Sequence, residues 1–381
     1  MKKFWVIQNI PSPYRLTMFD EMYRQLSELG VEFHVHLMAR GHKGRPKSWL
    51  NPQINFPHTY WKDHGVRSHH FNPGLICEVL RAKPDYLLVG NPFDTFTSIF
   101  VAMLYRHGVR ACWVEGQTKT PGKTNGFVGW FKRYIFSKFP LAAVPGSDAK
   151  RYFEMHQART RRKMPSCIYL PNLVDEKRFK IRSEWQEMDI MRMRESLGVK
   201  SNEKLCLIIA RLSSVKGLLP FFERLSHDML LGWKIVIFGE GPQKSAIEEV
   251  IRHKGISDNV RIFPYIKYSD MPLLYAASDL FLLPSVHDPN PLSVAEALHS
   301  GLPVAISSQC GNVEEGCIDG QDGNGWVLPV LDQEAYPKKL KEVFAAGIDE
   351  LRTKGHVSKS VNSKFWDSKK SIAKFLEDFG V

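Results

Sequence analysis

Two carboxylates in the stretch SVHDPNPLSVAEALHSG are spaced to bind a ligand rich in hydroxyl groups. Asp288 stands in a proline-rich loop, and Glu296 follows eight positions later in an apolar run that predicts a helix over 291–300. A carboxylate can accept hydrogen bonds from two neighbouring hydroxyls of a ribose or hexose. The helix would begin near Leu292 and Ser293, whose amides would face an anion. A glutamate on an amphipathic helix is usually solvated, which is the alternative for Glu296 alone.

Two basic residues in ARLSSVKG are placed to hold a diphosphate. Arg211 and Lys216 follow an apolar run that predicts a strand over 204–210. Open α/β sheets bind ligands at the carboxyl ends of their strands, and both cations can reach one diphosphate. Lys216 then leads into a predicted helix over 218–228 with its amino end toward the same anion. Two solvated loop charges are the alternative for this pair alone.

A glycine loop and a tyrosine add to this group. In IFGEGPQKS, Gly239 and Gly241 allow a sharp turn and a close approach to a ligand. Lys244 replaces the third glycine of a dinucleotide fingerprint, so a nicotinamide site is only weakly indicated. Tyr265 follows a predicted strand over 260–263 and could lie on a nucleobase or simply be a half-buried loop aromatic.

The elements that must position these residues alternate between apolar strands and amphipathic helices. This order predicts an α/β protein with two doubly wound parallel-sheet domains. We expect a first domain over 1–172, a second over 173–365, and a C-terminal helix over 366–381 that packs back on the first domain. The predicted strands are 4–9, 31–37, 85–90, 109–114, 141–144, 167–170, 204–210, 234–238, 260–263, 279–283 and 302–306, and the predicted helices include 14–29, 218–228, 243–254 and 269–277.

Positive charge is concentrated in the first half of the chain. The net charge is +12, with 28 Lys and Arg against 13 Asp and Glu in residues 1–180, and 24 against 27 in the remainder. The segments 126–140 and 158–165 combine basic and aromatic residues, which suits an anionic membrane surface. A core-packed helix with a solvated basic face fits equally well. Because no nucleic-acid-binding motif accompanies the charge, we expect no nucleic-acid partner.

The expected cellular compartment follows from three features that the sequence lacks: an export signal, a membrane span and a disulfide pattern. The apolar run after Met1 is too short for an export signal, and no run is long enough to span a membrane. The six cysteines contain no Cys-x-x-Cys pair, which predicts neither a zinc site nor a disulfide framework. We therefore expect a cytoplasmic protein, peripheral on the inner face of the membrane if the basic segments bind lipid.

The order of the motifs resembles the donor-binding domain of the family 4 glycosyltransferases, which are retaining enzymes of GT-B architecture. The resemblance covers about 165–381 well and 1–165 more loosely. It implies two Rossmann-like domains facing a central cleft, the first binding the acceptor and the second the nucleotide-sugar donor. Its segments are YLPNLVDEKRF, ARLSSVKG, IFGEGP, ASDLFLLPS, HDPNPLSVAEALHSGLPVAIS and FWDSKKSIAKFL.

The resemblance assigns donor-site roles to the residues above. Arg211 and Lys216 would neutralise the diphosphate, and Glu296 would hold the ribose. The backbone around Tyr265 and Ile266 would meet the nucleobase, and Asp288 the transferred sugar.

The chain departs from the family pattern at two places near Asp288. The family has Glu at that position, and its Pro-Phe-Gly is replaced here by Pro289-Asn290-Pro291. Because Asp is shorter and Pro291 has no N–H, the identity of the donor sugar is the property most affected.

In the first domain the pattern differs further. The loop NIPSPYRLTMF offers Ser12, Tyr14 and Arg15 as acceptor contacts where relatives often have glycines. Glu115 stands where many relatives have a histidine. It could hydrogen-bond the acceptor or the transferred sugar, or serve only the structure.

The sequence thus predicts retaining transfer of a hexose-type sugar from a nucleotide-sugar to a lipid-linked or oligosaccharide acceptor, in cell-surface polysaccharide biosynthesis. A UDP-sugar is favoured over GDP-mannose. No Asp-x-Asp motif is present, so we expect neither a metal nor another cofactor. Two alternatives stay open: a GT-B epimerase acting at C2 of a UDP-sugar, and an inactive partner subunit.

Overall fold

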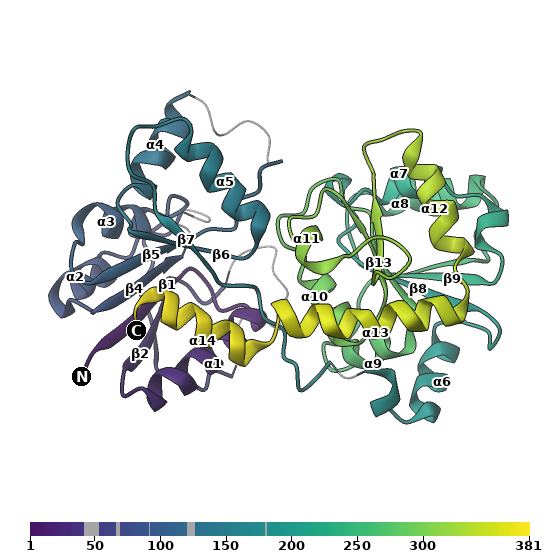
Figure 1. Ribbon diagram of the computed structural model, residues 1–381, viewed down its shortest axis with the longest axis horizontal. Coiled ribbons are helices and arrows are strands. Elements are labelled where there is room, and N and C mark those ends of the chain that lie inside the picture. Colours follow the sequence, from purple (N-terminus) through teal and green to yellow (C-terminus); the bar gives the residue numbers. More distant parts are fainter. Residues whose placement is uncertain (42–52, 66–68, 91, 120–125, 180) are drawn as a thin grey trace. The chain divides into compact units, whose positions relative to one another are not determined.

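The chain folds into two α/β units, each built on one parallel sheet (Figure 1). The computed structural model describes residues 1–381 except 42–52, 66–68, 91, 120–125 and 180. Unit 1 comprises Met1–Leu173 and Asp367–Val381, and unit 2 comprises Val174–Trp366. The prediction of two Rossmann-like parallel-sheet folds is confirmed.

Unit 1 has a seven-stranded sheet in the order β3-β2-β1-β4-β5-β6-β7. Its strands are β1 (Lys3–Gln8), β2 (Glu32–Leu37), β3 (His58–Tyr60), β4 (Tyr86–Gly90), β5 (Val109–Trp113), β6 (Leu141–Val144) and β7 (Ser166–Tyr169). Its helices are α1 (Pro13–Glu28), α2 (Pro73–Ala82), α3 (Phe96–Leu104), α4 (Gly126–Phe136), α5 (Ser147–Gln157) and α14 (Ser368–Phe379).

Both faces of this sheet are buried because apolar residues follow one another along each strand. In β1, Phe4 and Val6 point into a core shared with α1 and α14, whereas Trp5 and Ile7 point into a core shared with α2 to α5. Continuous apolar strands are typical of parallel sheets covered by helices on both faces.

The predicted C-terminal amphipathic helix is present as α14. Asp367 caps it by accepting a hydrogen bond from the Lys370 amide at 2.8 Å. The apolar face buries Ile372, Phe375 and Phe379 against α1 and β7 of unit 1.

Unit 2 has a six-stranded parallel sheet in the order β10-β9-β8-β11-β12-β13. Its strands are β8 (Lys204–Ile209), β9 (Trp233–Phe238), β10 (Val260–Phe263), β11 (Leu280–Leu283), β12 (Val304–Ser307) and β13 (Gly325–Leu328). Its α-helices are α6 (Glu187–Ser196), α7 (Leu218–Glu223), α8 (Lys244–His253), α9 (Met271–Ala277), α10 (Leu292–His299), α11 (Val313–Gly316), α12 (Ala335–Ala345) and α13 (Ile348–Phe365).

Three details differ from the sequence-based expectations. Strands β3 and β13 were not predicted. The helix expected over 218–228 ends at Glu223, where the amide of Arg224 turns back to the Phe221 carbonyl at 3.1 Å.

Among the described residues, every helix is too short or too polar to cross a bilayer.

Candidate functional site

The loops after β8 and β11 meet at the carboxyl edge of the unit 2 sheet. β8 pairs with β9 on one side and β11 on the other, so successive connections diverge at this point. Open parallel sheets bind ligands at such a switch point. Hydrogen bonds from the amides of Val286 and His287 to the Val215 carbonyl, at 3.0 and 3.1 Å, tie the two loops together. The predicted diphosphate residues, Arg211 and Lys216, and the residue predicted to meet the transferred sugar, Asp288, lie on these loops.

Glycines allow these loops to approach closely. Gly217 has a φ of +66°, and a Cβ there would lie 2.2 Å from the Pro284 carbonyl oxygen. Beside them, a Cβ on Gly239 would lie 1.9 Å from the Ala210 carbonyl oxygen, and Gly241 is packed likewise against the backbone of Leu212. The loops after β8, β9 and β11 therefore form one continuous backbone-lined edge.

Lys216 and Asp288 form an ion pair across this edge, through Nζ and Oδ2. The sequence placed Lys216 on a diphosphate and Asp288 on a sugar, and the structure brings the two side chains into contact. Asp288 is 8% exposed, so its charge is balanced mainly by this lysine. The ammonium has further N–H donors for an anion. Arg211 lies exposed at the start of the same loop.

Glu296 is buried inside α10 with one hydrogen-bonded partner. The hydroxyl of Tyr275, from α9, donates to Oε2 of Glu296 at 2.7 Å. Burial raises the pKa of Glu296 to about 7, although the Tyr275 hydrogen bond and the charge of Arg178 act to lower it. Burial also raises the pKa of the Tyr275 phenol, which keeps it a donor. Glu296 is thus a carboxyl group whose charge changes near neutral pH.

The proline-rich loop before α10 is fixed by the segment that follows β12. The amide of Gly311 donates to the Asp288 carbonyl at 2.9 Å. Nδ2 of Asn312 donates to the Pro291 carbonyl at 3.0 Å and to Oδ1 of Asn290 at 3.3 Å. These bonds hold the loop that leads into α10. The helix begins at Leu292 and Ser293, and its amino end lies at the carboxyl edge of the sheet.

The predicted nucleobase segment lies on the loop after β10. Tyr265 is 63% exposed, and Ile266 packs partly against the unit 2 core. Tyr268 lies on the same loop, and Arg178, from the segment between β7 and α6, places its guanidinium 3.7 Å from the Tyr268 ring centroid and donates to the Tyr268 backbone carbonyl. A planar cation stacked on an aromatic ring offers a flat surface to a ligand.

Sequence reasoning missed four residues of this site: Arg178, Tyr268, Tyr275 and Asn312. Arg178 lies within the motif VDEKRF, which was noted for its family pattern rather than for its charge. The other three gave no signal, because their roles depend on contacts between segments distant in the sequence.

In unit 1, the predicted acceptor residues gather around one carboxylate. Nη2 of Arg15 bonds Oε1 of Glu115 at 2.9 Å, and Nδ2 of Asn172 bonds the same oxygen at 2.8 Å. The guanidinium lies 3.4 Å from the Trp113 ring centroid and 5.1 Å from that of Tyr14. Arg15 is 5% exposed and holds Glu115 in place.

Ser12 is buried at the amino end of α1, where its carbonyl accepts hydrogen bonds from the amides of Arg15 and Leu16. It serves the turn into the helix. Of the predicted unit 1 residues, Glu115 keeps the more exposed side chain, at 34%.

These arrangements support binding of a phosphorylated, hydroxyl-bearing ligand in unit 2. Lys216, Arg211 and the amino end of α10 offer positive potential, while Glu296 and Asp288 offer hydrogen-bond acceptors. In the described ranges, no three His, Cys, Asp or Glu side chains gather into a possible metal site.

The comparisons with known proteins agree with this geometry. Residues 189–354 match the family model described as glycosyl transferases group 1. Over 176 residues the chain is 30% identical to an uncharacterized glycosyltransferase of Methanocaldococcus jannaschii, covering 45% of this chain and 41% of that protein. Over 127 residues it is 30% identical to the alpha-monoglucosyldiacylglycerol synthase of Streptococcus pneumoniae, covering 32% and 28%. The chain thus spans less than half the length of these two relatives.

A solved structure resembles the whole chain. HepE of Anabaena, crystallised with UDP and glucose, gives a TM-score of 0.72 at 16% identity, covering 100% of both chains. At that identity the likeness concerns the fold, and the predicted GT-B fold is confirmed. The match over residues 189–354 lies within unit 2, so this unit is similar to the domain of the group 1 glycosyl transferases, in a chain with the GT-B fold.

Proposed function

We propose that this protein is a retaining glycosyltransferase that moves a hexose-type sugar from a nucleotide-sugar donor to a lipid-linked or oligosaccharide acceptor. The observation that carries the proposal is the Lys216–Asp288 ion pair at the switch point of a group 1 glycosyl transferase domain. Cleaving a sugar–phosphate bond places negative charge on the leaving diphosphate. Lys216 and Arg211 are positioned to stabilise that charge without a metal ion.

The proposed donor contacts follow from the same geometry. Asp288, fixed by Lys216, accepts hydrogen bonds from the transferred sugar, and Glu296 accepts them from the ribose. The exposed loop at Tyr265 and Ile266 meets the nucleobase. A UDP-sugar is the favoured donor, with GDP-mannose second, and the HepE structure, which contains UDP, supports that order.

Nucleotide binding tests the proposal directly. We expect UDP at about 100 times its Kd to stabilise the protein by about 2.7 kcal/mol, which raises the melting temperature by several degrees. The Arg211→Ala variant should lose most of this shift. Inorganic phosphate at the same concentration is the control for simple anion binding. If neither UDP, GDP nor their sugars raise the melting temperature, the donor site is wrongly placed.

Product analysis separates transfer from epimerisation. Incubation with UDP-N-acetylglucosamine and no acceptor should leave the configuration at C2 unchanged. Formation of the 2-epimer would replace the transferase proposal with the epimerase alternative.

We further propose that the acceptor is reached at the cytoplasmic face of a membrane, in cell-surface polysaccharide biosynthesis. On α4, Phe127 is 76% and Trp130 47% exposed, and their rings stack at 5.7 Å. Ile135 and Phe136 of the same helix face the core, so α4 is packed on one side and apolar on the other. Lys138 and Arg162 lie over the Tyr134 ring beside this surface. Aromatic and basic side chains together favour anionic lipid.

Vesicle sedimentation tests membrane binding. We expect the protein to sediment with vesicles containing phosphatidylserine and to bind weakly to phosphatidylcholine alone. The double variant Phe127→Ser/Trp130→Ser should reduce binding about tenfold or more, because two buried aromatic contacts are lost. Tyr265→Ser, which removes an exposed aromatic residue of unit 2, is the matched control. Equal binding by the double variant and the control would contradict the surface assignment.

A further inference from the structure

The segment before α2, described over residues 61–65 and 69–72, lies at the carboxyl edge of the unit 1 sheet. Nδ2 of Asn72 donates to the Met38 carbonyl at 3.0 Å, just beyond β2. The amide of Thr97, at the start of α3, donates to the His70 carbonyl at 3.2 Å. Because β1 pairs with both β2 and β4, this edge holds the switch point of the unit 1 sheet. The segment thus lies where such sheets bind ligands.

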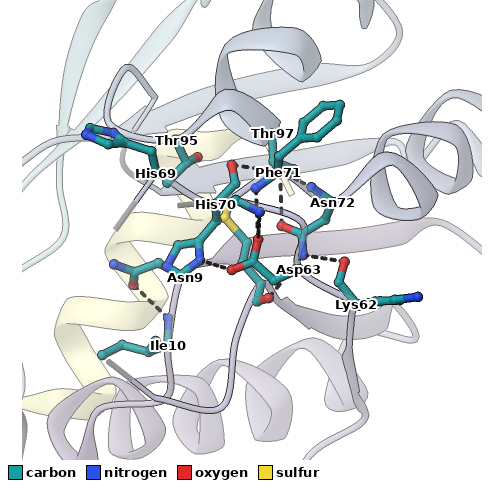
Figure 2. Close-up of polar contacts among 12 residues, drawn as sticks. Asn9, Ile10, Lys62, Asp63, His69, His70, Phe71, Asn72, Thr95 and Thr97 are labelled. Carbon is teal, nitrogen blue, oxygen red and sulfur yellow. Dashed lines mark hydrogen bonds and ion pairs between the residues drawn. The ribbon is translucent and has the colours of Figure 1, made fainter. Parts of the chain in front are cut away.

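Within this segment, Asp63 and His70 form a pair of fixed orientation (Figure 2). Oδ1 of Asp63 accepts hydrogen bonds from the amides of Gly65 and Phe71, at 2.9 and 3.0 Å. Its Oδ2 lies 2.6 Å from Nδ1 of His70. The pKa of Asp63 is lowered because these hydrogen bonds outweigh the effect of its burial, so the carboxylate is ionised and only accepts.

This pairing determines what the other ring nitrogen can do. An ionised carboxylate at Nδ1 requires the proton there, so in the neutral imidazole Nε2 carries the lone pair. His70 is 3% exposed, and Nε2 has no hydrogen-bond partner among the described residues, although it is not fully enclosed. A nearly buried imidazole is thus held with one acceptor nitrogen available to a ligand.

Asn9 supplies a complementary donor at the end of β1. Its Oδ1 accepts hydrogen bonds from Nε2 of Gln8 at 2.7 Å and from the Ile10 amide at 2.8 Å. The two donors identify this atom as the oxygen, so Nδ2 is the atom left for a ligand. Figure 2 shows Asn9 and His70 in the same small region of unit 1.

The Asp63–His70 pair could serve only to stabilise the loop, but the hydrogen bonds of Asn72 already stabilise it. Nδ2 of Asn72 holds the Met38 and Lys62 carbonyls, each at 3.0 Å, and its Oδ1 accepts from the Thr97 hydroxyl at 3.0 Å. A purely structural role explains the contact of Nδ1 of His70 with Asp63. It does not explain an acceptor nitrogen left available at a ligand-binding edge.

We propose that Nε2 of His70 and Nδ2 of Asn9 form a binding site for the hydroxyl groups of a neutral polyol, with Asp63 as the residue that positions the imidazole. A hydroxyl can donate to Nε2, and its neighbour can accept from Nδ2. The assignment of the sugar acceptor as the natural ligand of this site rests on the proposed function. Polyol binding at this site does not depend on it.

Side-chain ¹⁵N resonances of the full-length protein test the site. The probes are methyl α-glucoside, methyl α-galactoside, glycerol and, as an anion, inorganic phosphate. Before addition, the His70 spectrum should show the proton on Nδ1. At least one polyol should shift the His70 Nε2 and Asn9 Nδ2 signals in a saturable manner. The His70→Ala variant should weaken that binding about tenfold at Asn9, which corresponds to the loss of one hydrogen bond to a buried group.

Controls separate the possible outcomes. His64→Ala removes an exposed imidazole of the same segment and should leave polyol binding unchanged. Asp63→Asn should alter the protonation of His70 and weaken binding, whereas a structural role alone would change only the melting temperature. If no polyol shifts the His70 Nε2 or the Asn9 Nδ2 resonance, or if only phosphate shifts them, the site does not bind polyols. UDP-induced stabilisation in unit 2 reports separately on the proposed function.

Discussion

Replacement of Lys216 by alanine is expected to lower kcat/KM for sugar transfer about 100- to 1,000-fold, the usual cost of removing one group that stabilises developing charge. Two effects combine in this variant. The leaving diphosphate loses an ammonium, and the Asp288 carboxylate loses the cation that balances its charge. The measurement is the steady-state rate with a UDP-sugar that stabilises the protein, with donor concentration varied at saturating acceptor.

The ion pair makes a specific prediction for the double variant. Lys216→Ala leaves a carboxylate of 8% exposure without its partner, and Asp288→Asn in the same protein removes that charge. The melting temperature should therefore recover in the double variant while transfer stays low. Lys216→Arg should restore part of the activity because it keeps the charge. Lys254→Ala, at an exposed lysine after α8, is the control. Normal transfer by Lys216→Ala would exclude this lysine from the chemistry.

Much of the fold could be predicted from local patterns. The strands predicted over 234–238 and 260–263 coincide with β9 and β10 to within a residue. In β9 the cause is the apolar run from Ile235 to Phe238, since a buried parallel strand needs continuous apolar side chains. α10 was predicted over 291–300 and lies over 292–299. β3 and β13 were not predicted, since their strand character comes from pairing with β2 and β12 at the sheet edges.

The residue types of the site could be predicted from the sequence, but the contacts between their side chains could not. Arg211, Lys216 and Asp288 follow strands in the sequence, and topology brings their loops together. That Lys216 contacts Asp288, or that Tyr275 contacts Glu296, depends on the order β9-β8-β11 and on how α9 packs beside α10. Arg15 shows the same limit. The sequence offered it as an acceptor contact, but its packing on Trp113 and its bond to Glu115 depend on segments distant in the sequence.

Glu296 is expected to make nucleotide binding depend on pH near neutrality. Its pKa is about 7, so the carboxyl group is mostly neutral at pH 6 and mostly ionised at pH 8. Ribose hydroxyls donate more strongly to the ionised form. The affinity for UDP should therefore fall about tenfold from pH 8 to pH 6, in proportion to the ionised fraction. Titration calorimetry at several pH values measures this.

Two comparisons isolate Glu296 from the ionisation of the ligand's own phosphate. Glu296→Gln keeps the shape and removes the titration, so its affinity should vary with pH only as much as the phosphate requires. A UDP analogue without ribose hydroxyls should give the same pH profile with both proteins. Identical profiles for UDP itself with both proteins would show that Glu296 does not contact the ribose.

The stability of the protein should change in the opposite sense to its affinity for UDP. An ordinary glutamate in the unfolded chain has a pKa of about 4.3, below the folded value, so the folded state binds the proton more tightly between these limits. The stabilisation is complete below the unfolded pKa and is lost as pH rises toward 7. Relative to Glu296→Gln, the wild-type free energy of unfolding should fall by about 3 kcal/mol over this range.

The Tyr275→Phe variant tests the cause of the pKa directly. The phenol hydrogen bond lowers the pKa of Glu296 by stabilising its ionised form, so removing the bond should raise that pKa further. The midpoint of the pH dependence of UDP binding should then move upward. The substitution would also leave Oε2 of Glu296 without its partner, which destabilises the protein by about 1–3 kcal/mol at pH 8, where the carboxylate is charged. A midpoint that stays in place or moves downward would show that Tyr275 does not control the charge of Glu296.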